Sequence, residues 1–515
     1  MLVKTFGSAV YGVEAITIAV EVSVNNQGKP DAVIVGLPDS AVKESMLRVE
    51  SAIKDNHYHM PRTRVIVNLA PADIRKSGTA FDLPIAIGVL AASEQLDAPE
   101  KLTDYVIMGE LSLNGEVRPI KGALPIAIQA RKENFKGLIV PQQNAREAAM
   151  VNNLKVYGVS HINEVIDFLK DENTLEPVIV NTREEFANAQ GSFEIDFCDV
   201  KGQENIKRAL EIAAAGGHNA ILIGPPGAGK TMLAKRLPTI LPPLTLLEAL
   251  ETTKIHSVAG KLPENATLIS KRPFRSPHHT ISDVALVGGG GNPQPGEISL
   301  AHNGVLFLDE LPEFKRTVLE VMRQPMEERK VTISRAKVAL DFPASFMLIA
   351  SMNPCPCGFF NHPEKECTCP PGAVQKYLNK ISGPLLDRID LHVEVTPVAF
   401  AELSSSRQFE KSEAVRARVI KAREIQAERY KDNEGVYANA QMSSKMLKEI
   451  CVINTASQNL LKVAMEKLNL SARAYDRILK VSRTIADLAG SADIKAEHLA
   501  EAIQYRSLDR EGWGG

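Results

Sequence analysis

The 515-residue sequence lacks the long apolar run that a membrane-spanning helix requires. Its first residues also lack a clean signal-peptide core and cleavage site, so we expect a cytoplasmic protein that has no membrane partner. An excess of charge of one sign is missing too, because 60 Lys and Arg residues nearly balance 62 Asp and Glu residues. The charge of the whole chain therefore gives no indication of a nucleic-acid ligand, and any basic surface must be local.

Cysteines spread along the chain are also absent, since only six occur and four of them lie between residues 355 and 369. This distribution excludes a disulfide framework and fits a reducing compartment. The length suggests three or four domains. We expect residues 1–170 to mix strands and helices, 171–192 to form a polar, acidic linker, 193–400 to form a doubly wound α/β domain, and 401–515 to be helical.

The most informative stretch is Gly224–Thr231, which matches the phosphate-loop pattern G-x-x-x-x-G-K-[ST]. An apolar run precedes it and a helical stretch follows it, whereas an ordinary Gly-rich turn, the alternative, needs neither. Lys230 would reach the β- and γ-phosphates of ATP, and Thr231 would hold Mg²⁺. The remaining residues of the loop would turn backbone groups and a helix N-terminus toward the phosphates: Gly224, Pro225, Pro226, Gly227, Ala228 and Gly229.

Two later apolar stretches end in polar side chains that suit nucleotide hydrolysis. Val305–Leu308 precedes Asp309 and Glu310, about eighty residues after the phosphate loop. Asp309 would hold Mg²⁺, directly or through water, and Glu310 would activate the attacking water. Residues 346–352 lead to Asn353, which would sense the γ-phosphate; the alternative is an asparagine that merely ends a strand before a proline.

Residues 382–391 (Ser-Gly-Pro-Leu-Leu-Asp-Arg-Ile-Asp-Leu) resemble the magnesium-chelatase-like and MCM-like branch of the AAA+ ATPases. The resemblance extends from residue 193 to the C-terminus. It implies that Arg388 is an arginine finger, which reaches into the site of the neighbouring subunit in a ring of six. A planar, permanently charged guanidinium would stabilise charge on the transferred phosphoryl group. Alternatively, Arg388 is a surface residue paired with Asp387 or Asp390.

The same resemblance implies that the C-terminal helices form a lid carrying a second arginine sensor. Arg473 in Leu470–Arg477 matches that sensor, and Arg477 is the alternative because it lies one helical turn further on.

Residues 330–340 alternate in polarity on both sides of a basic centre, which predicts a β-hairpin. In the family that the chain resembles, a hairpin at this place faces the pore of the ring. Arg335 and Lys337 are therefore candidate contacts to DNA phosphates, independent of base sequence. The alternative is an exposed, charged turn that only aids solubility.

A Gly- and Pro-rich segment between residues 271 and 296 is expected to be an ordered but mobile loop. Its neighbouring His278 and His279 are expected to point apart, which argues against a shared metal ion.

Two C-x-C pairs, Cys355/Cys357 and Cys367/Cys369, lie in an insert that spans residues 354–372. Four thiolates in a reducing compartment predict a tetrahedral zinc site, although C-x₂-C is the more usual spacing. His362 is a substitute ligand in this interpretation, and four free thiols are the alternative. Together with residues 382–391, the insert makes the chain similar to the ComM/YifB group and unlike true magnesium-chelatase subunits.

Residues 1–170 resemble the proteolytic domain of Lon. The turn around Thr79 lies where Lon has its nucleophile, and Gly109–Leu124 follows Lon's Gly-Glu-Ile segment. The resemblance places Leu124 at the position of Lon's general-base lysine, and Lys121 is three residues out of register. A Ser–Lys mechanism needs an amine to accept the hydroxyl proton, so we expect a structural or DNA-guiding platform without proteolysis.

These resemblances lead to one favoured function and three alternatives. We favour an ATP- and Mg²⁺-dependent hexameric ring motor on DNA, a branch-migration helicase that aids recombination of incoming DNA in natural transformation. A Lon-type protease would depend on Thr79. A metal-insertion ATPase like magnesium chelatase would need a partner subunit and would not respond to DNA. A nucleotide-binding scaffold without turnover would not need Glu310 and Arg388, and both are intact.

Overall fold

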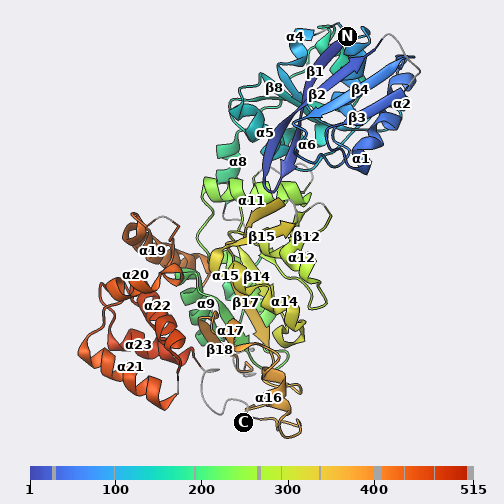
Figure 1. The fold of residues 1–515 in the computed structure, drawn as a ribbon. Coiled ribbons are helices and arrows are strands. Elements are labelled where there is room, and N and C mark those ends of the chain that lie inside the picture. Colours follow the sequence, from blue (N-terminus) through green and yellow to red (C-terminus); the bar gives the residue numbers. More distant parts are fainter. Residues whose placement is uncertain are drawn as a thin grey trace.

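The computed structural model describes residues 1–25, 31–97, 99–190, 193–263, 268–291, 293–335, 338–362, 364–398, 409–433, 435–468 and 470–506. An N-terminal α+β domain, a central α/β domain and a C-terminal helical domain follow one another along the chain (Figure 1). This arrangement confirms the predicted fold class. Within the described part of the chain, every helix is too short or too polar to cross a membrane.

The N-terminal domain is built on a mixed sheet of seven strands with the order β3–β4–β2–β1–β5–β8–β9. Polar and apolar residues alternate along β2, and Ile18, Val20 and Val22 are fully buried on one face of the sheet. The apolar helix α3 packs across β1 and β2 and is buried on all sides. The strands are β1 (Leu2–Tyr11), β2 (Glu14–Val24), β3 (Asp31–Val35), β4 (Arg64–Ala70), β5 (Tyr105–Ile107), β8 (Gly137–Pro141) and β9 (Lys155–Val159), with a small hairpin of β6 (Glu110–Leu111) and β7 (Val117–Arg118). The helices are α1 (Ser40–Lys43), α2 (Ser45–Asp55), α3 (Asp82–Ala92), α4 (Pro99–Leu102), α5 (Ala123–Lys132), α6 (Gln142–Ala148) and α7 (Ile162–Leu169).

The segment predicted as a linker contains a helix, α8 (Thr182–Ala189), and is partly packed. Val178 and Val180 belong to a hydrophobic cluster that also contains residues of α5 and of the central domain's α11 (Leu246–Ala259). The backbone N–H of Gly122 also donates to Ser257 O (3.1 Å), which ties the start of α5 to α11. The N-terminal domain therefore rests on α11 through both apolar and polar contacts (Figure 1).

The central domain has a five-stranded parallel sheet with the order β11–β14–β17–β10–β18. Because all strands run the same way, their carboxyl ends lie at one edge, where ligands of such sheets bind. The strand β11 was missed by the sequence analysis, which assigned its residues to a loop. The strands are β10 (Ala220–Ile223), β11 (Phe274–Arg275), β14 (Val305–Leu308), β17 (Met347–Met352) and β18 (Leu391–Glu394). The helices include α9 (Glu204–Gly216), α10 (Lys230–Arg236), α12 (Asp283–Val287), α13 (Glu297–Leu300), α14 (Arg316–Glu320), α15 (Arg323–Glu328), α16 (Ala373–Leu378) and α17 (Gly383–Leu386).

The helical domain packs on α9 of the central domain through α19 (Ser412–Tyr430) and α22 (Ala472–Leu488). A buried imidazole joins the two domains, because His218 lies 3.1 Å from Asp390 Oδ2 and 2.7 Å from Thr484 Oγ1 of α22. Burial lowers the pKa of His218, although the hydrogen bond and the charge of Asp390 act in the opposite direction. The helices of the domain are α19 (Ser412–Tyr430), α20 (Ser444–Ile450), α21 (Thr455–Lys467), α22 (Ala472–Leu488) and α23 (Ala496–Gln504), as the sequence periodicity predicts.

Candidate ATPase site and thiolate cluster

Lys230 lies near the end of the phosphate loop and is the first residue of α10. Its buried ammonium donates to the carbonyl oxygens of Gly224 (2.6 Å) and Pro225 (2.9 Å) and to Asn353 Oδ1 (3.2 Å). Burial lowers the pKa of this ammonium, although the nearby carboxylate of Asp309 acts in the opposite direction. The structure thus brings together the predicted lysine, which begins α10, and the predicted sensor asparagine, which directly follows β17.

Asp309 lies directly after β14 and holds two hydroxyl groups. Its Oδ2 accepts a hydrogen bond from Thr231 Oγ1 (2.8 Å), and its Oδ1 accepts one from Ser351 Oγ. A hydroxyl and a carboxylate in contact are oxygen ligands of the kind that Mg²⁺ prefers. Ser351 was missed by the sequence analysis, although a signal existed: it lies near the end of β17, two residues before the predicted sensor Asn353, and side chains two residues apart in an extended chain project to one face.

Glu310 adopts a left-handed backbone conformation (φ 53°), which is uncommon outside glycine and concentrates at functional sites. Its carboxylate Oε2 lies 3.8 Å from His279 Nδ1. The strand β11, which pairs Phe274 with Val305 and Arg275 with Leu306 of β14, lies shortly before His279 in the chain, as β14 does before Glu310. His279 is therefore a neighbour of the predicted base that the sequence analysis did not find.

The rings of His278 and His279 lie together, with centroids 4.1 Å apart. The prediction that they point apart is wrong. Alternation of side chains holds within an extended strand, and His278 lies beyond β11 in a turn where its carbonyl accepts the N–H of Ile281 (3.0 Å).

Arg388 follows α17 and is largely buried, with 13% of its side chain exposed. Its guanidinium lies 2.5 Å from Glu327 Oε1 of α15 and donates to Pro384 O (2.6 Å). The partner in the chain is thus Glu327, and the alternative pairing with Asp387 or Asp390 does not occur.

Those two aspartates instead hold the candidate sensors of the lid. Arg473 lies 2.7 Å from Asp387 Oδ2, and Arg477 lies 3.0 Å from Asp390 Oδ1. The Arg473 side chain is 66% exposed, whereas that of Arg477 is 24% exposed. Both lid arginines therefore adjoin the short stretch that carries Arg388.

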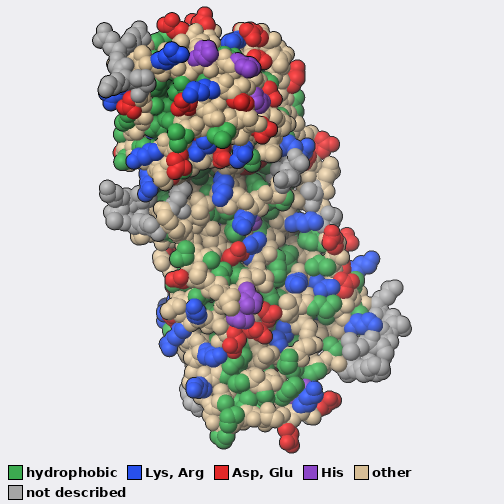
Figure 2. Space-filling model, turned by 90° about the vertical axis from the view of Figure 1, so that its right-hand side faces the viewer, with side chains coloured by type: hydrophobic (Ala, Val, Ile, Leu, Met, Phe, Trp, Pro, Cys, Tyr) green, Lys and Arg blue, Asp and Glu red, His purple; other side chains and the backbone are tan. Residues whose placement is uncertain are grey.

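The predicted basic hairpin forms from β15 (Lys330–Arg335) and β16 (Val338–Pro343) in antiparallel register. The side chain of Arg335 and all of Lys337 lie outside the described residues, so their contacts with DNA stay a prediction. On the face seen in Figure 2, Lys and Arg side chains are interspersed with Asp and Glu.

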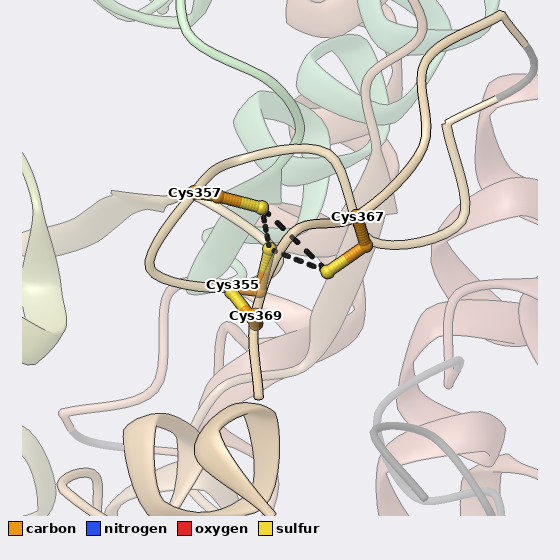
Figure 3. Close-up of side chains that lie close together, drawn as sticks. All are labelled: Cys355, Cys357, Cys367 and Cys369. Carbon is orange, nitrogen blue, oxygen red and sulfur yellow. Dashed lines mark hydrogen bonds between the residues drawn. The ribbon is translucent and has the colours of Figure 1, made fainter. Parts of the chain in front are cut away.

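The four cysteines of the insert lie together after β17 (Figure 3). All four Sγ atoms lie within 4.8 Å of one another, and three of the pairs are separated by 3.3, 3.6 and 3.8 Å. Four sulfurs around a zinc ion at ~2.3 Å would be about 3.8 Å apart, so the cluster has the size of a tetrahedral thiolate site. Although burial raises the pKa of Cys357, hydrogen bonds led by the Phe359 N–H lower it to about 5.

His362, the substitute ligand, is not part of this cluster. Its Nδ1 accepts the backbone N–H groups of Glu364 (3.0 Å) and Lys365 (3.1 Å), so this nitrogen shapes the loop.

Thr79, at the position of Lon's nucleophile, lines a cavity of 1510 Å³ between the N-terminal and central domains. Its hydroxyl donates to Glu110 Oε2, a carboxylate. Lys121 lines the same cavity, and Leu124, at the position of Lon's lysine, is fully buried. The hydroxyl therefore has an acceptor, but this acceptor is a different group from the amine that a Ser–Lys mechanism uses.

Comparison with known proteins matches residues 196–403 to the family described as "Magnesium chelatase, subunit ChlI", residues 20–144 to "Subunit ChlI of Mg-chelatase" and residues 409–506 to "Magnesium chelatase, subunit ChlI C-terminal". The competence protein ComM of Haemophilus influenzae is 46% identical over 511 residues, which cover 99% of this chain and 98% of that protein. YifB of Salmonella typhimurium is 44% identical over 508 residues, 98% of this chain and 96% of that protein. Lon protease 2 of Bacillus subtilis is 33% identical over 154 residues, 27% of this chain and 26% of that protein. The chain belongs to the magnesium-chelatase-like AAA+ ATPase family, in the group of ComM and YifB.

Proposed function

We propose that the protein is a cytoplasmic ATP-hydrolysing motor that forms a hexameric ring on DNA and promotes branch migration during recombination of incoming DNA in natural transformation. The likeness to a competence protein over 99% of the chain supports the biological role. The observation that carries the motor activity is the convergence of Lys230, Thr231, Asp309 and Asn353 at one edge of the sheet, with Glu310 beside them.

In this proposal each residue of the site has one task. Mg²⁺ held by Thr231 and Asp309 supplies positive charge beside the phosphates. Lys230 exchanges its carbonyl partners in the loop for phosphate oxygens, whose charge favours the ammonium form that burial disfavours. Glu310 accepts the proton of the attacking water. Asn353, which contacts Lys230, reports whether the γ-phosphate is present.

We place Arg388 and Arg473 at the boundary between subunits. Asp387 adjoins Arg388 in the chain and holds Arg473, so Arg473 is anchored next to Arg388. If Arg388 completes the site of a neighbour, Arg473 approaches the same site. The ion pair of Arg388 with Glu327 would then exchange for a phosphate when the ring closes on ATP.

The DNA activity is tested by ATPase rates without DNA, with single-stranded DNA and with branched DNA. We expect DNA to raise the rate of the wild type, and no stimulation by any DNA would overturn the motor. The part of the ATPase rate that is lost in Glu310→Gln is the part that this site produces. Thr79→Ala should retain the DNA-stimulated rate, because the motor does not use that hydroxyl, whereas ATP-dependent hydrolysis of a peptide that Thr79→Ala abolishes would favour the protease alternative.

The tip of the hairpin should provide part of this response. We expect the double substitution of Arg335 and Lys337 by Ala to bring the DNA-stimulated rate down toward the DNA-free rate. Each lost phosphate contact should also reduce the slope of log affinity against log salt by about one. Lys330→Ala is the matched control, because Lys330 pairs with Asp341 (2.8 Å) at the base of the same hairpin. Equal losses in both variants would remove the tip from the DNA contact.

We also propose that Cys355, Cys357, Cys367 and Cys369 bind zinc. We expect about one zinc per chain by elemental mass spectrometry, because four thiolates of this spacing fill a structural zinc site. Cys367→Ser should lower the zinc content, whereas Cys451→Ser should not, since Cys451 is a buried cysteine of the lid away from the cluster. If the wild-type protein is purified without metal and does not take up added zinc, the alternative of four free thiols is correct.

A further inference from the structure

We propose that the thiolate cluster is a support for the phosphate loop, so that affinity for ATP depends on the metal held by the four cysteines. This inference rests on the proposed ATPase and zinc site and adds a link between them. The link runs through the turn Cys355–Gly358, which we call the cysteine turn.

The first connection runs along the chain. Asn353, which contacts Lys230, is two residues before Cys355. Cys355 is fully buried, and its Sγ accepts the backbone N–H of Phe360 (3.3 Å). Cys355 is therefore an anchor close to the nucleotide site, and a metal ion at its sulfur would restrain the backbone that carries Asn353.

The second connection crosses space. Gly358 has a left-handed backbone (φ 85°), and its N–H donates to Cys355 O (3.0 Å), which closes the cysteine turn. A Cβ added at Gly358 would lie 2.6 Å from Cδ of Pro226, in the phosphate loop. The backbone of the cysteine turn thus lies directly against the phosphate loop, at a distance that only glycine permits.

The phosphate loop is also held from its other side. Gly224 N–H donates to Met352 O (3.2 Å), and a Cβ added at Gly224 would lie 2.3 Å from Val395 O. A cavity of 80 Å³ is the space left between Gly224, Pro225, Pro354 and Gly358. The start of the loop is therefore enclosed by the ends of β17 and β18 and by the cysteine turn.

The insert has no regular secondary structure among its described residues, 354–362 and 364–372, to fix its conformation. Four sulfurs on a single metal ion would join its two ends, Cys355/Cys357 and Cys367/Cys369, and metal binding at such a site orders the chain around it. Loss of the metal would release the cysteine turn from Pro226, and a loop that must present several donors to phosphate tolerates little displacement.

Two glycine substitutions test whether the cysteine turn supports the phosphate loop without changing metal binding. Gly358 and Gly372 both have left-handed backbones (φ 85° and 77°), so alanine strains both. Only Gly358 has a neighbour, since a Cβ at Gly372 meets nothing within 4 Å. We expect Gly358→Ala to keep the zinc content of the wild type and to bind a fluorescent ATP analogue at least about tenfold more weakly. Gly372→Ala should bind it within about twofold of the wild type, because its added methyl group has open space.

Metal removal is the second arm. Chelator-treated wild type should lose affinity for the ATP analogue to a similar extent and regain it when zinc is added. Cys367→Ser should show the loss without the recovery, with circular dichroism to show that the fold is kept. Metal-free protein that binds the analogue as tightly as loaded protein, or Gly358→Ala that binds like Gly372→Ala, would overturn the inference. Because these measurements use no DNA, they do not depend on the motor; a wild type that binds no nucleotide would overturn the ATPase itself.

Discussion

Replacing Glu310 with Gln should lower the rate of ATP hydrolysis by about 10²–10⁴-fold, the usual contribution of a general base, and leave ATP binding nearly unchanged. The amide has almost the shape of the carboxylate but does not accept the proton of the attacking water. The residues that would hold ATP and Mg²⁺ contact one another without Glu310, because Thr231 donates to Asp309 and Lys230 donates to Asn353. Affinity for nucleotide should therefore persist while turnover falls.

This result is checked by single-turnover hydrolysis together with binding of a fluorescent ATP analogue. Glu313→Gln is the matched control, because Glu313 lies three residues further along and pairs with Lys380 (3.1 Å). A turnover of Glu310→Gln within a few-fold of the wild type would assign the base to another group. A loss of binding equal to the loss of turnover would show that Glu310 holds the nucleotide.

The sequence predicted where the phosphate loop and Asp309 lie in the fold, because both are marked by short patterns of neighbouring residues. Gly227 and Gly229 have left-handed backbones with open space around them, as a loop that turns N–H groups toward an anion requires. The strands around the site were also predictable, since buried parallel strands are continuous apolar runs. Asn353 follows β17 and Lys230 lies in the loop and helix that follow β10. Because β17 and β10 are neighbours in one parallel sheet, the two residues meet at the same edge.

What could not be predicted depends on contacts between distant segments. The strand β11 has only two residues, and its pairing with β14, which brings His279 to Glu310, leaves no periodic pattern in the sequence. The pair of Arg388 and Glu327 joins residues of α15 and the turn after α17, which meet only in the folded domain. The packing of Val178 on the α5–α11 cluster is of the same kind, because its segment reads as polar and acidic overall.

Replacing Arg388 with Ala should lower the ATPase rate by about 10³–10⁵-fold, the range known for arginine fingers. In the single chain this arginine is paired with Glu327, so a loss of activity alone would not distinguish a finger from a structural ion pair. Arg323→Ala is a control for the ion-pair effect, because Arg323 begins α15 and pairs with Glu320 (2.7 Å) on the same side of the domain.

An experiment that mixes two inactive variants distinguishes an arginine finger from a structural ion pair at Arg388. An Arg388→Ala subunit retains its own Lys230, and a Lys230→Ala subunit retains its own Arg388, so each alone should be nearly inactive. In a ring assembled from equal amounts of both, about one interface in four joins an intact phosphate loop to an intact arginine, because head-to-tail contacts pair unlike surfaces. The mixture should therefore recover up to about a quarter of the wild-type rate if sites act independently. If Arg388 served only its own chain, no mixture of the two variants would recover, and the site shared between subunits would be wrong.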